Sequence, residues 1–290
     1  MPTIRRTPAP PLPALLALPA LPALPALPAL LALLALLALL ALLGVAIARP
    51  PGRSCPLGQV DRVALIGLRR KHDKVRLTME RLAGQLDGLP PLELFEAIDG
   101  AALCTGHEET CPPALRPYVS DLGWVHLLEA VAGDADGWRL TPGAIGCALS
   151  HRQLWQEAAE RQQTVLVLED DCVLRGPLGP ALHALRRFCC RSQLLYLGYG
   201  EQPAAEGEPA LPLWASEADR HLPVRRVREL HGTFGYIVTP AGAAHLLRRC
   251  FPLRYQIDTE MYRAFAPLRP LAAVPPLLDH DDSLGTSIQT

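Results

Sequence analysis

Thr164-Val165-Leu166-Val167-Leu168-Glu169-Asp170-Asp171 is the stretch of sequence that decides the fold. Its first part is an unbroken apolar run without polar alternation, which is typical of a central strand covered on both faces. Three carboxylates follow directly. Because ligands of open α/β sheets bind outside the carboxyl ends of the strands, the stretch predicts a buried strand with a ligand site at its end.

The flanking segments predict an α/β fold with a mostly parallel central sheet. Strands are expected at 62–67 and 92–97, and the segment between them, 73–86, carries apolar residues at helical spacing. This strand–helix–strand order is typical of a βαβ unit. Thr141 and Pro142 form a helix start signal, since Thr caps a helix and Pro suits its first turn. Further strands are expected at 194–197 and 234–238, and helices at 141–162, 178–188 and 240–247.

The chain begins with an apolar leader that we set apart from a folded domain at 60–290. Residues 1–28 are rich in Pro, Ala and Leu, and prolines three residues apart disfavour a regular helix. Residues 29–48 lack both proline and charge, and as a helix they would span ~30 Å, the thickness of a bilayer core. A signal anchor fits this length, a cleaved signal peptide is the alternative, and a low-complexity start is the third. Residues 49–59 are expected to form a stem.

Composition narrows the compartment and the partners. The formal net charge of −1 gives no reason to expect a nucleic-acid partner. An anchored chain would place its domain in the lumen of the secretory pathway (endoplasmic reticulum or Golgi), and a secreted or periplasmic protein is the alternative. The even count of 8 cysteines fits disulfides in an oxidising compartment, with Cys104 and Cys111 as the favoured local pair. Cys147 and Cys172 are expected to be free thiols, and the lack of a Cys-x-x-Cys motif argues against a zinc site.

The acidic triplet is a candidate site for a hard divalent cation. Mg²⁺ and Mn²⁺ take oxygen ligands and could bridge these carboxylates to a substrate diphosphate. Consecutive carboxylates also repel one another without a cation. An acidic turn or a helix cap is the alternative, and the position alone leaves both open.

Val167-Leu168-Glu169-Asp170-Asp171-Cys172 is similar to the Glu-Asp-Asp element of glycosyltransferase family 25. The sequence resembles this family, which includes lipopolysaccharide and collagen hydroxylysine galactosyltransferases. The other similar segments follow in the family's order from about Val60 to the C-terminus: the Ala-x-Asp-Gly element at 95–100, the Gly-Cys-x-x-Ser-His element at 140–151, the later Tyr and Asp positions at 235–238 and 256–258, and the closing segment at 275–288.

Two positions depart from the family's pattern. Gly67 stands where the first strand usually carries Asn, and Lys74 stands where Arg is expected. The missing Asn removes a side-chain donor near the nucleotide. The resemblance nevertheless implies a nucleotide-sugar-binding fold of the GT-A type, a UDP-sugar donor (most simply UDP-galactose), a protein or glycan acceptor, and Mn²⁺ or Mg²⁺ as cofactor.

The resemblance also implies roles for the metal-site residues. Asp171 would ligate the metal, and Asp170 would share the metal or contact the ribose. Glu169 would support the site without touching the ligand. His280, in the acidic tail, is the candidate third ligand, and a surface histidine is the alternative.

Five further residues are implied as substrate-binding or catalytic. Ser150 and His151 would bind donor or acceptor, although a helical histidine is more often a packing residue. Asp99 and Tyr236 are assigned to substrate binding. Asp258 is the candidate general base for the acceptor hydroxyl, and a helix cap is its alternative.

Two rival functions remain. A catalytically inactive relative could serve as a binding or adhesion module, which the glycine at position 67 favours and the intact triplet opposes. A metal-dependent phosphoesterase would need further His and Asp ligands at strand ends, and the sequence offers no such set.

Overall fold

A computed structural model describes residues 56–103, 113–133, 139–189, 191–200 and 224–285. These residues belong to one unit, Arg53–Thr290. The predicted leader and anchor, 1–28 and 29–48, lie outside the described residues, as do Cys104 and Cys111. Within the described residues, no helix is both long and apolar enough to cross a membrane.

Seven of the described strands form a mixed central sheet in the order β2-β1-β3-β7-β5-β8-β6. Five of the seven run in one direction, because only β7 and β6 are antiparallel to their neighbours. A separate pair, β4 and β9, runs antiparallel. The bounds are β1 Arg62–Gly67, β2 Leu92–Glu96, β3 Val165–Glu169, β4 Cys172–Leu174, β5 Leu194–Gly198, β6 Val224–Arg226, β7 Gly235–Val238, β8 Leu271–Ala273 and β9 Leu278–His280.

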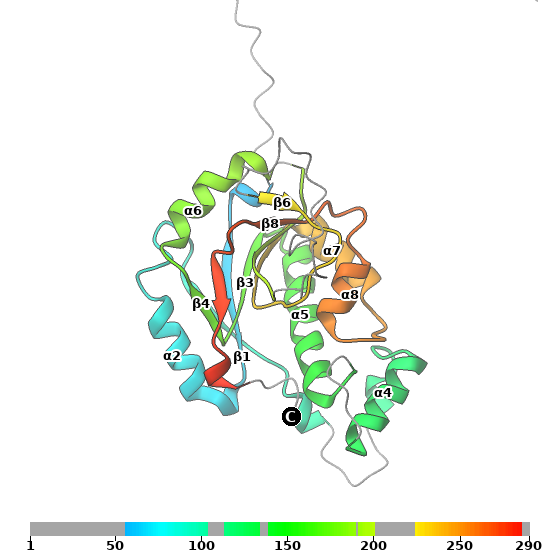
Figure 1. Cartoon of the computed structure of the whole chain (residues 1–290). Coiled ribbons are helices and arrows are strands. Elements are labelled where there is room, and N and C mark those ends of the chain that lie inside the picture. The colour runs from blue at the N-terminus through cyan, green and yellow to red at the C-terminus, as the bar shows by residue number, and fades with distance from the viewer. Residues whose placement is uncertain (1–55, 104–112, 134–138, 190, 201–223, 286–290) are drawn as a thin grey trace, which may run out of the picture. The chain divides into compact units, whose positions relative to one another are not determined.

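Helices cover both faces of this sheet (Figure 1), so the α/β fold class is confirmed and the sheet is mostly parallel as predicted. The bounds are α2 His72–Leu82, α3 Gly100–Leu103, α4 Asp121–Val131, α5 Pro142–Glu160, α6 Leu178–Leu185, α7 Pro240–Arg249 and α8 Ile257–Arg263. Short 3₁₀ turns occur at Pro56–Gly58, Arg69–Lys71, Pro113–Leu115, Arg186–Phe188 and Asp282–Leu284.

Successive side chains of the central strands point to opposite faces of the sheet and pack into two separate hydrophobic cores. Val165 and Val167 of β3 pack with α5, α7 and α8 on one face, whereas Leu166 and Leu168 pack with α2 and α6 on the other. All four side chains are fully buried. This two-sided burial explains why the β3 sequence is apolar at every position, as expected for a strand between two helical layers.

The long helix α5 begins where the sequence predicts. The Thr141 hydroxyl accepts a hydrogen bond from the Ala144 amide at 3.0 Å, and Pro142 occupies the first turn. Near its start α5 touches α3, and glycine is required there. A Cβ on Gly146 would lie 2.4 Å from the Gly100 amide nitrogen, and one on Gly100 would lie 1.7 Å from the Pro142 carbonyl oxygen.

The C-terminal tail contributes a strand that the sequence pattern does not predict. β9 pairs antiparallel with β4, so that His280 lies opposite Cys172. The backbone amide of Asp281 also donates to the Asp171 carbonyl at 2.8 Å. The tail is thereby held against the end of the acidic triplet.

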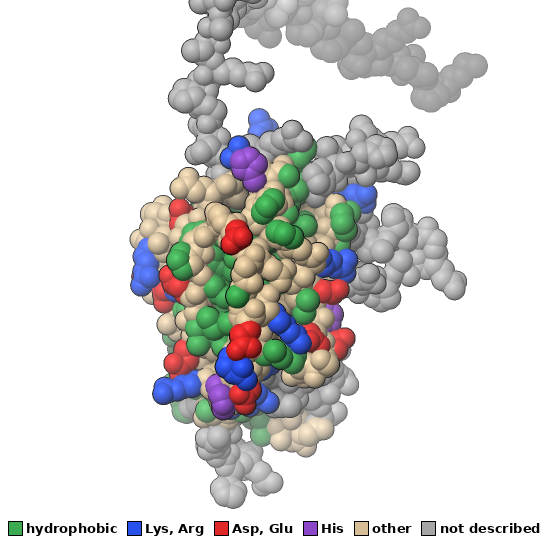
Figure 2. Space-filling view, turned by 90° about the vertical axis from the view of Figure 1, so that its left-hand side faces the viewer, with side chains coloured by type: hydrophobic (Ala, Val, Ile, Leu, Met, Phe, Trp, Pro, Cys, Tyr) green, Lys and Arg blue, Asp and Glu red, His purple; other side chains and the backbone are tan. Residues whose placement is uncertain are grey.

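Charges are mixed on the face that carries α2. Figure 2 shows acidic and basic side chains interspersed with apolar ones on this face. On α2 itself, Arg76 pairs with Glu80 at 2.9 Å and with Asp73 at 3.6 Å. Such pairing agrees with the near-neutral net charge.

Candidate active site

Two adjoining cavities open at the carboxyl end of β3. The larger, about 530 Å³, lies between this strand end, α8 and the C-terminal tail. The smaller, about 60 Å³, lies between the ends of β1 and β3, the 97–100 segment and α5. Cys147, Glu169 and Asp171 line both cavities. The site is therefore where parallel strands end, as the sequence predicts.

Lys74 of α2 lies between the two aspartates of the triplet. Its Nζ is 2.8 Å from Asp170 Oδ1 and 3.6 Å from Asp171 Oδ2, and it donates to the Gly285 carbonyl at 3.1 Å. Burial disfavours the charged amine, but the hydrogen bonds and charges of the two aspartates outweigh it and raise the pKa of Lys74. The side chain is 8% exposed and stays an ammonium.

Asp171 is a carboxylate with too little positive charge around it. Burial, followed by the charge of Glu169, raises its pKa to about 6, although Lys74 opposes the shift. Its Oδ1 is buried and lacks a hydrogen-bond partner among the described residues. Asp170 and Asp171 thus share one ammonium, and the carboxylate of Glu169 adds a third negative charge beside them. The remaining charge of about −2 and the unpaired oxygen suit a divalent cation.

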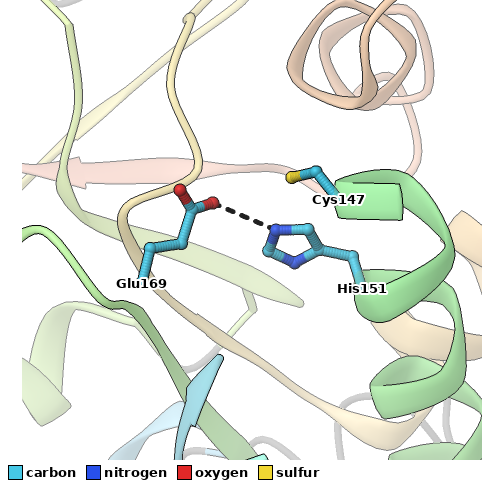
Figure 3. A group of neighbouring side chains, drawn as sticks. All are labelled: Cys147, His151 and Glu169. Carbon is cyan, nitrogen blue, oxygen red and sulfur yellow. Dashed lines mark hydrogen bonds and ion pairs between the residues drawn. The ribbon is translucent and has the colours of Figure 1, made fainter. Parts of the chain in front are cut away.

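Glu169, the last residue of β3, is oriented by a chain of buried side chains. Its Oε1 accepts from the Thr233 hydroxyl and lies 3.1 Å from His151 Nε2 (Figure 3). His151 Nδ1 is 2.8 Å from the Tyr236 hydroxyl, which accepts from Trp155 Nε1 at 2.8 Å. Both ring nitrogens of His151 are thus engaged.

The direction of each hydrogen bond follows from the acceptor at one end. An ionised Glu169 only accepts, so His151 Nε2 must carry the proton. With a neutral imidazole, Nδ1 accepts from the Tyr236 hydroxyl, while the Tyr236 oxygen accepts from Trp155 Nε1. The chain Trp155, Tyr236, His151, Glu169 is therefore satisfied at every link.

Ser150 and Asp99 lie at the small cavity but are tied to backbone and neighbouring side chains. The Ser150 hydroxyl accepts from the Ile98 amide at 2.8 Å and donates to the Gly146 carbonyl at 2.7 Å. Asp99 accepts from Arg70 Nε at 2.5 Å and from the Ala101 amide at 3.1 Å. Burial raises the pKa of Asp99, but the Arg70 hydrogen bond and charge outweigh it, so the net pKa is lowered.

Asp258 lies in the first turn of α8 and lines the large cavity. Its carboxylate accepts from the Thr259 amide at 2.6 Å and the Gly232 amide at 3.1 Å, and it lies 3.6 Å from His231 Nδ1. Burial alone would raise the pKa of Asp258, but the hydrogen bonds from His231 and Gly232 outweigh it, so the net pKa is lowered. The cap of α8 is Gln256, so Asp258 is not the helix cap of the alternative interpretation.

The remaining predicted residues are placed differently. His280 lines the large cavity together with Asp171, but its Nε2 is 2.9 Å from Asp282 and its side chain is 42% exposed. Tyr236 and His151 are fully buried, with their polar atoms engaged as described. In this arrangement they position Glu169, and a direct substrate contact would require both to move.

The sequence pattern did not predict one cluster of potential metal ligands. Among the described residues, a sulfur of Cys147, a ring nitrogen of His151 and a carboxylate oxygen of Glu169 lie within 4.8 Å of one another. The predicted set of Asp170, Asp171 and His280 does not form such a group. Cys147 and His151 are four residues apart on α5 and so share a helix face, which is the signal that could have indicated their meeting.

Comparison with known proteins assigns the family. The model of "Glycosyltransferase family 25 (LPS biosynthesis protein)" matches residues 65–209, half of the chain. The chain belongs to glycosyltransferase family 25. The matched region contains the strand β3, the acidic triplet and all of α5, so the residues that build the small cavity are family residues.

Curated members of glycosyltransferase family 25 are similar to this chain at 27–30% identity. Human procollagen galactosyltransferase 2 is 28% identical over 194 residues, which cover 64% of this chain and 27% of the human protein. Xenopus laevis procollagen galactosyltransferase 1-A is 30% identical over 192 residues (64% and 28%). A Bos taurus protein named "Probable inactive glycosyltransferase 25 family member 3" is 28% identical over 227 residues (74% and 33%). The match thus spans about a third or less of these relatives.

Proposed function

We propose that the chain is a glycosyltransferase that moves a hexose from a UDP-sugar to a hydroxyl of a protein or glycan, assisted by Mn²⁺ or Mg²⁺. Galactose is the favoured sugar because relatives in the same family are named galactosyltransferases. One observation carries the proposal. The Asp170–Asp171 pair sits at the carboxyl end of β3, between two joined cavities, in a chain of this family.

The two cavities suggest separate places for donor and acceptor. We assign the UDP moiety to the strand-end region around Asp99, Ser150 and Asp170, in a fold of the GT-A type. We assign the sugar and the acceptor hydroxyl to the larger cavity, where Asp171 and Asp258 face the same space. The small cavity must open to admit a nucleotide, since its volume of about 60 Å³ is below that of typical ligand pockets, roughly 300–1,000 Å³.

The residues of the triplet fit a divalent cation. Asp171, with its unpaired buried oxygen, and Asp170 would hold it, and His280 could approach from the tail. When bound, such an ion supplies positive charge to a departing diphosphate. Lys74 keeps Asp170 and Asp171 oriented toward one point, and His151 together with Thr233 fixes Glu169 beside them.

Asp258 is the proposed general base. Its lowered pKa keeps it ionised at neutral pH, so it can accept the acceptor hydroxyl's proton, although a lowered pKa also makes it a weak base. Neighbouring His231 stabilises its charge. The pKa of His231 is raised, chiefly by its hydrogen bond to Asp258.

An inactive binding module is the second candidate, and one structural observation favours it. Gly67 lines the small cavity and has no side chain, so the cavity lacks the donor that the family's asparagine would provide. A Cβ at this position would lie 2.5 Å from Val75 Cγ2, so a larger residue would require the Val75 side chain to shift.

The experiment is a screen of UDP-sugars with and without Mn²⁺, read as UDP release. We expect release from the wild-type chain with Mn²⁺ and its near loss in Asp171→Asn. Asp87→Asn is the matched control, because Asp87 is exposed and lines neither of these cavities. If wild type released no more UDP than Asp171→Asn with any donor, the inactive module would replace the enzyme as the proposal.

We also propose a location in the lumen of the secretory pathway. A luminal location, anchored through residues 29–48 and carrying the domain at 60–290, fits an acceptor on a secreted protein or glycan. Release of tagged protein by alkaline carbonate extraction would contradict the anchor.

A further inference from the structure

Cys147 and Glu169, which line both cavities, meet the buried His151 and so bring sulfur and nitrogen donors beside one carboxylate of the acidic triplet. Cys147 offers a thiol, His151 an imidazole and Glu169 one carboxylate, and Figure 3 shows the three side chains converging between α5 and the end of β3. Sulfur and nitrogen donors favour zinc over magnesium or manganese. The pair Asp170–Asp171 offers only oxygen and suits the harder ions.

We infer that Cys147, His151 and Glu169 form a binding site for Zn²⁺, separate from the carboxylate pair Asp170–Asp171. The site goes beyond the proposed transfer reaction, and its existence does not depend on that reaction.

The spacing of the donors fits zinc after small side-chain movements. Zn–S bonds of about 2.3 Å and Zn–N or Zn–O bonds of about 2.0–2.2 Å place tetrahedral donors about 3.3–3.7 Å apart. His151 Nε2 and Glu169 Oε1 are already 3.1 Å apart, and all three donors lie within 4.8 Å. Because Cys147 and His151 project from one face of α5, a shift of about 1 Å closes the set.

Tyr236 lies where the outer partner of a zinc-binding histidine usually lies. A ligating imidazole commonly donates its second N–H to an outer partner that fixes the ring. Here that partner is the Tyr236 oxygen, 2.8 Å from Nδ1. On binding, the imidazole proton moves from Nε2 to Nδ1. The Tyr236 oxygen then accepts a hydrogen bond from Nδ1–H through its second lone pair. The thiol proton of Cys147 goes to solvent, and the Tyr236 hydroxyl proton loses its acceptor, which moderates the affinity.

Access and charge favour the ion. Cys147 and Glu169 line both cavities, so the fourth coordination position faces open space. Burial, and then the carboxylates around it, raise the pKa of the Cys147 thiol, so the ion must displace a firmly held proton. The same carboxylates, those of Asp258, Asp171 and Asp170 among them, make the surroundings negative. Lys74 is already committed to two of them. A cation entering either cavity therefore meets an attractive potential.

The test is Zn²⁺ titration of the purified, reduced full chain against a chromophoric chelator, with Co²⁺ as a second probe whose thiolate charge-transfer band reports sulfur ligation. Cys147→Ser should remove that band and weaken Zn²⁺ binding by at least the ~10–100-fold that loss of an outer-shell partner costs. Cys250→Ser is the matched control, because Cys250 is another free thiol, buried at the end of α7. It should retain both signals.

Three results would overturn the inference. The band could persist in Cys147→Ser, the two serine variants could bind Zn²⁺ equally, or Asp171→Asn alone could remove the zinc binding. A measurement on wild type keeps the test decisive if Cys147→Ser does not fold. Zn²⁺, unlike Mg²⁺, should slow alkylation of Cys147 by iodoacetamide, followed by peptide mass spectrometry. Equal rates with both ions would also refute the site.

Discussion

Replacing Tyr236 by phenylalanine tests the buried chain that orients Glu169. The substitution removes one oxygen and leaves the ring, which is fully buried on β7. Two partners then lose their hydrogen bonds: the Trp155 N–H and the His151 Nδ1, each 2.8 Å from that oxygen. Both lie in side chains without exposed surface, so water cannot replace the lost partner.

The expected loss follows from these two orphaned groups. Each buried unsatisfied group costs about 1–3 kcal/mol. Because neighbouring effects are not additive, we expect the free energy of unfolding to fall by about 2–4 kcal/mol. That is a large share of the roughly 5–15 kcal/mol that holds a typical domain together.

A second tyrosine supplies the control. Tyr196 is equally buried, and its ring centre lies 6.0 Å from that of Tyr236. Among the described residues, its hydroxyl has one hydrogen-bond partner, the Met261 sulfur at 3.9 Å. A thioether is a weak acceptor. Tyr196→Phe should therefore cost less than about 1 kcal/mol, well below the usual range for a buried group left unpaired.

Equilibrium urea unfolding measures both losses. The transition midpoint should fall for Tyr236→Phe with an unchanged slope, since the surface exposed on unfolding stays the same. Equal losses for the two variants, within about 0.5 kcal/mol, would show that the hydroxyl of Tyr236 does no more than that of Tyr196. Such a result would show that the hydrogen bonds linking Trp155, Tyr236 and His151 do not stabilise the fold.

Two further predictions concern the fold and the ion pair at α8. Gly146→Ala should destabilise the chain by about 3 kcal/mol, because its Cβ would lie 2.4 Å from a backbone nitrogen. The control is Gly176→Ala, whose Cβ meets nothing within 4 Å and whose stability should stay within about 0.5 kcal/mol of wild type. Equal effects of the two substitutions in thermal melts would contradict the close approach. The pKa of His231 is raised in the folded chain, chiefly by Asp258, so its stabilising contribution is present below its usual value and is lost as pH rises through the raised one. The pKa of Asp258 is lowered, so its contribution is lost only in acid, as pH falls below its usual value. Because the His231 side chain is 40% exposed, the free energy of unfolding of wild type should exceed that of His231→Gln by less than about 1 kcal/mol near pH 6. A difference between the two in urea unfolding that does not shrink toward alkaline pH would contradict this pairing.

The elements that the sequence predicts well are those with local signals. The apolar run at 164–168 is β3, Val165–Glu169, and the Thr141–Pro142 signal begins α5 at Pro142. Hydrophobic pattern and capping chemistry act within a few residues, so they are visible without a fold. The helix expected at 73–86 ends earlier, at Leu82, and Gly84 follows with a φ of 78°.

Features that depend on distant pairing escaped prediction. β9 is a short polar strand, and its partner β4 lies about a hundred residues earlier. The meeting of Cys147 and His151 with Glu169 likewise depends on how α5 packs against β3. Lys74 approaches the aspartates only because α2 lies beside the strand end. Sequence reasoning could name the triplet and several residues near it, such as His151 and His280, but not the contacts that these residues make.

The contact between Gly100 and Gly146 joins two sequence motifs into one mechanical unit. The Ala-x-Asp-Gly and Gly-Cys-x-x-Ser-His elements meet backbone to backbone, with no room for a methyl group between them. A side chain at either position would push the two elements apart, and with them the small cavity that both elements line. These two glycines therefore serve the architecture of the chain, and their presence does not by itself indicate catalysis.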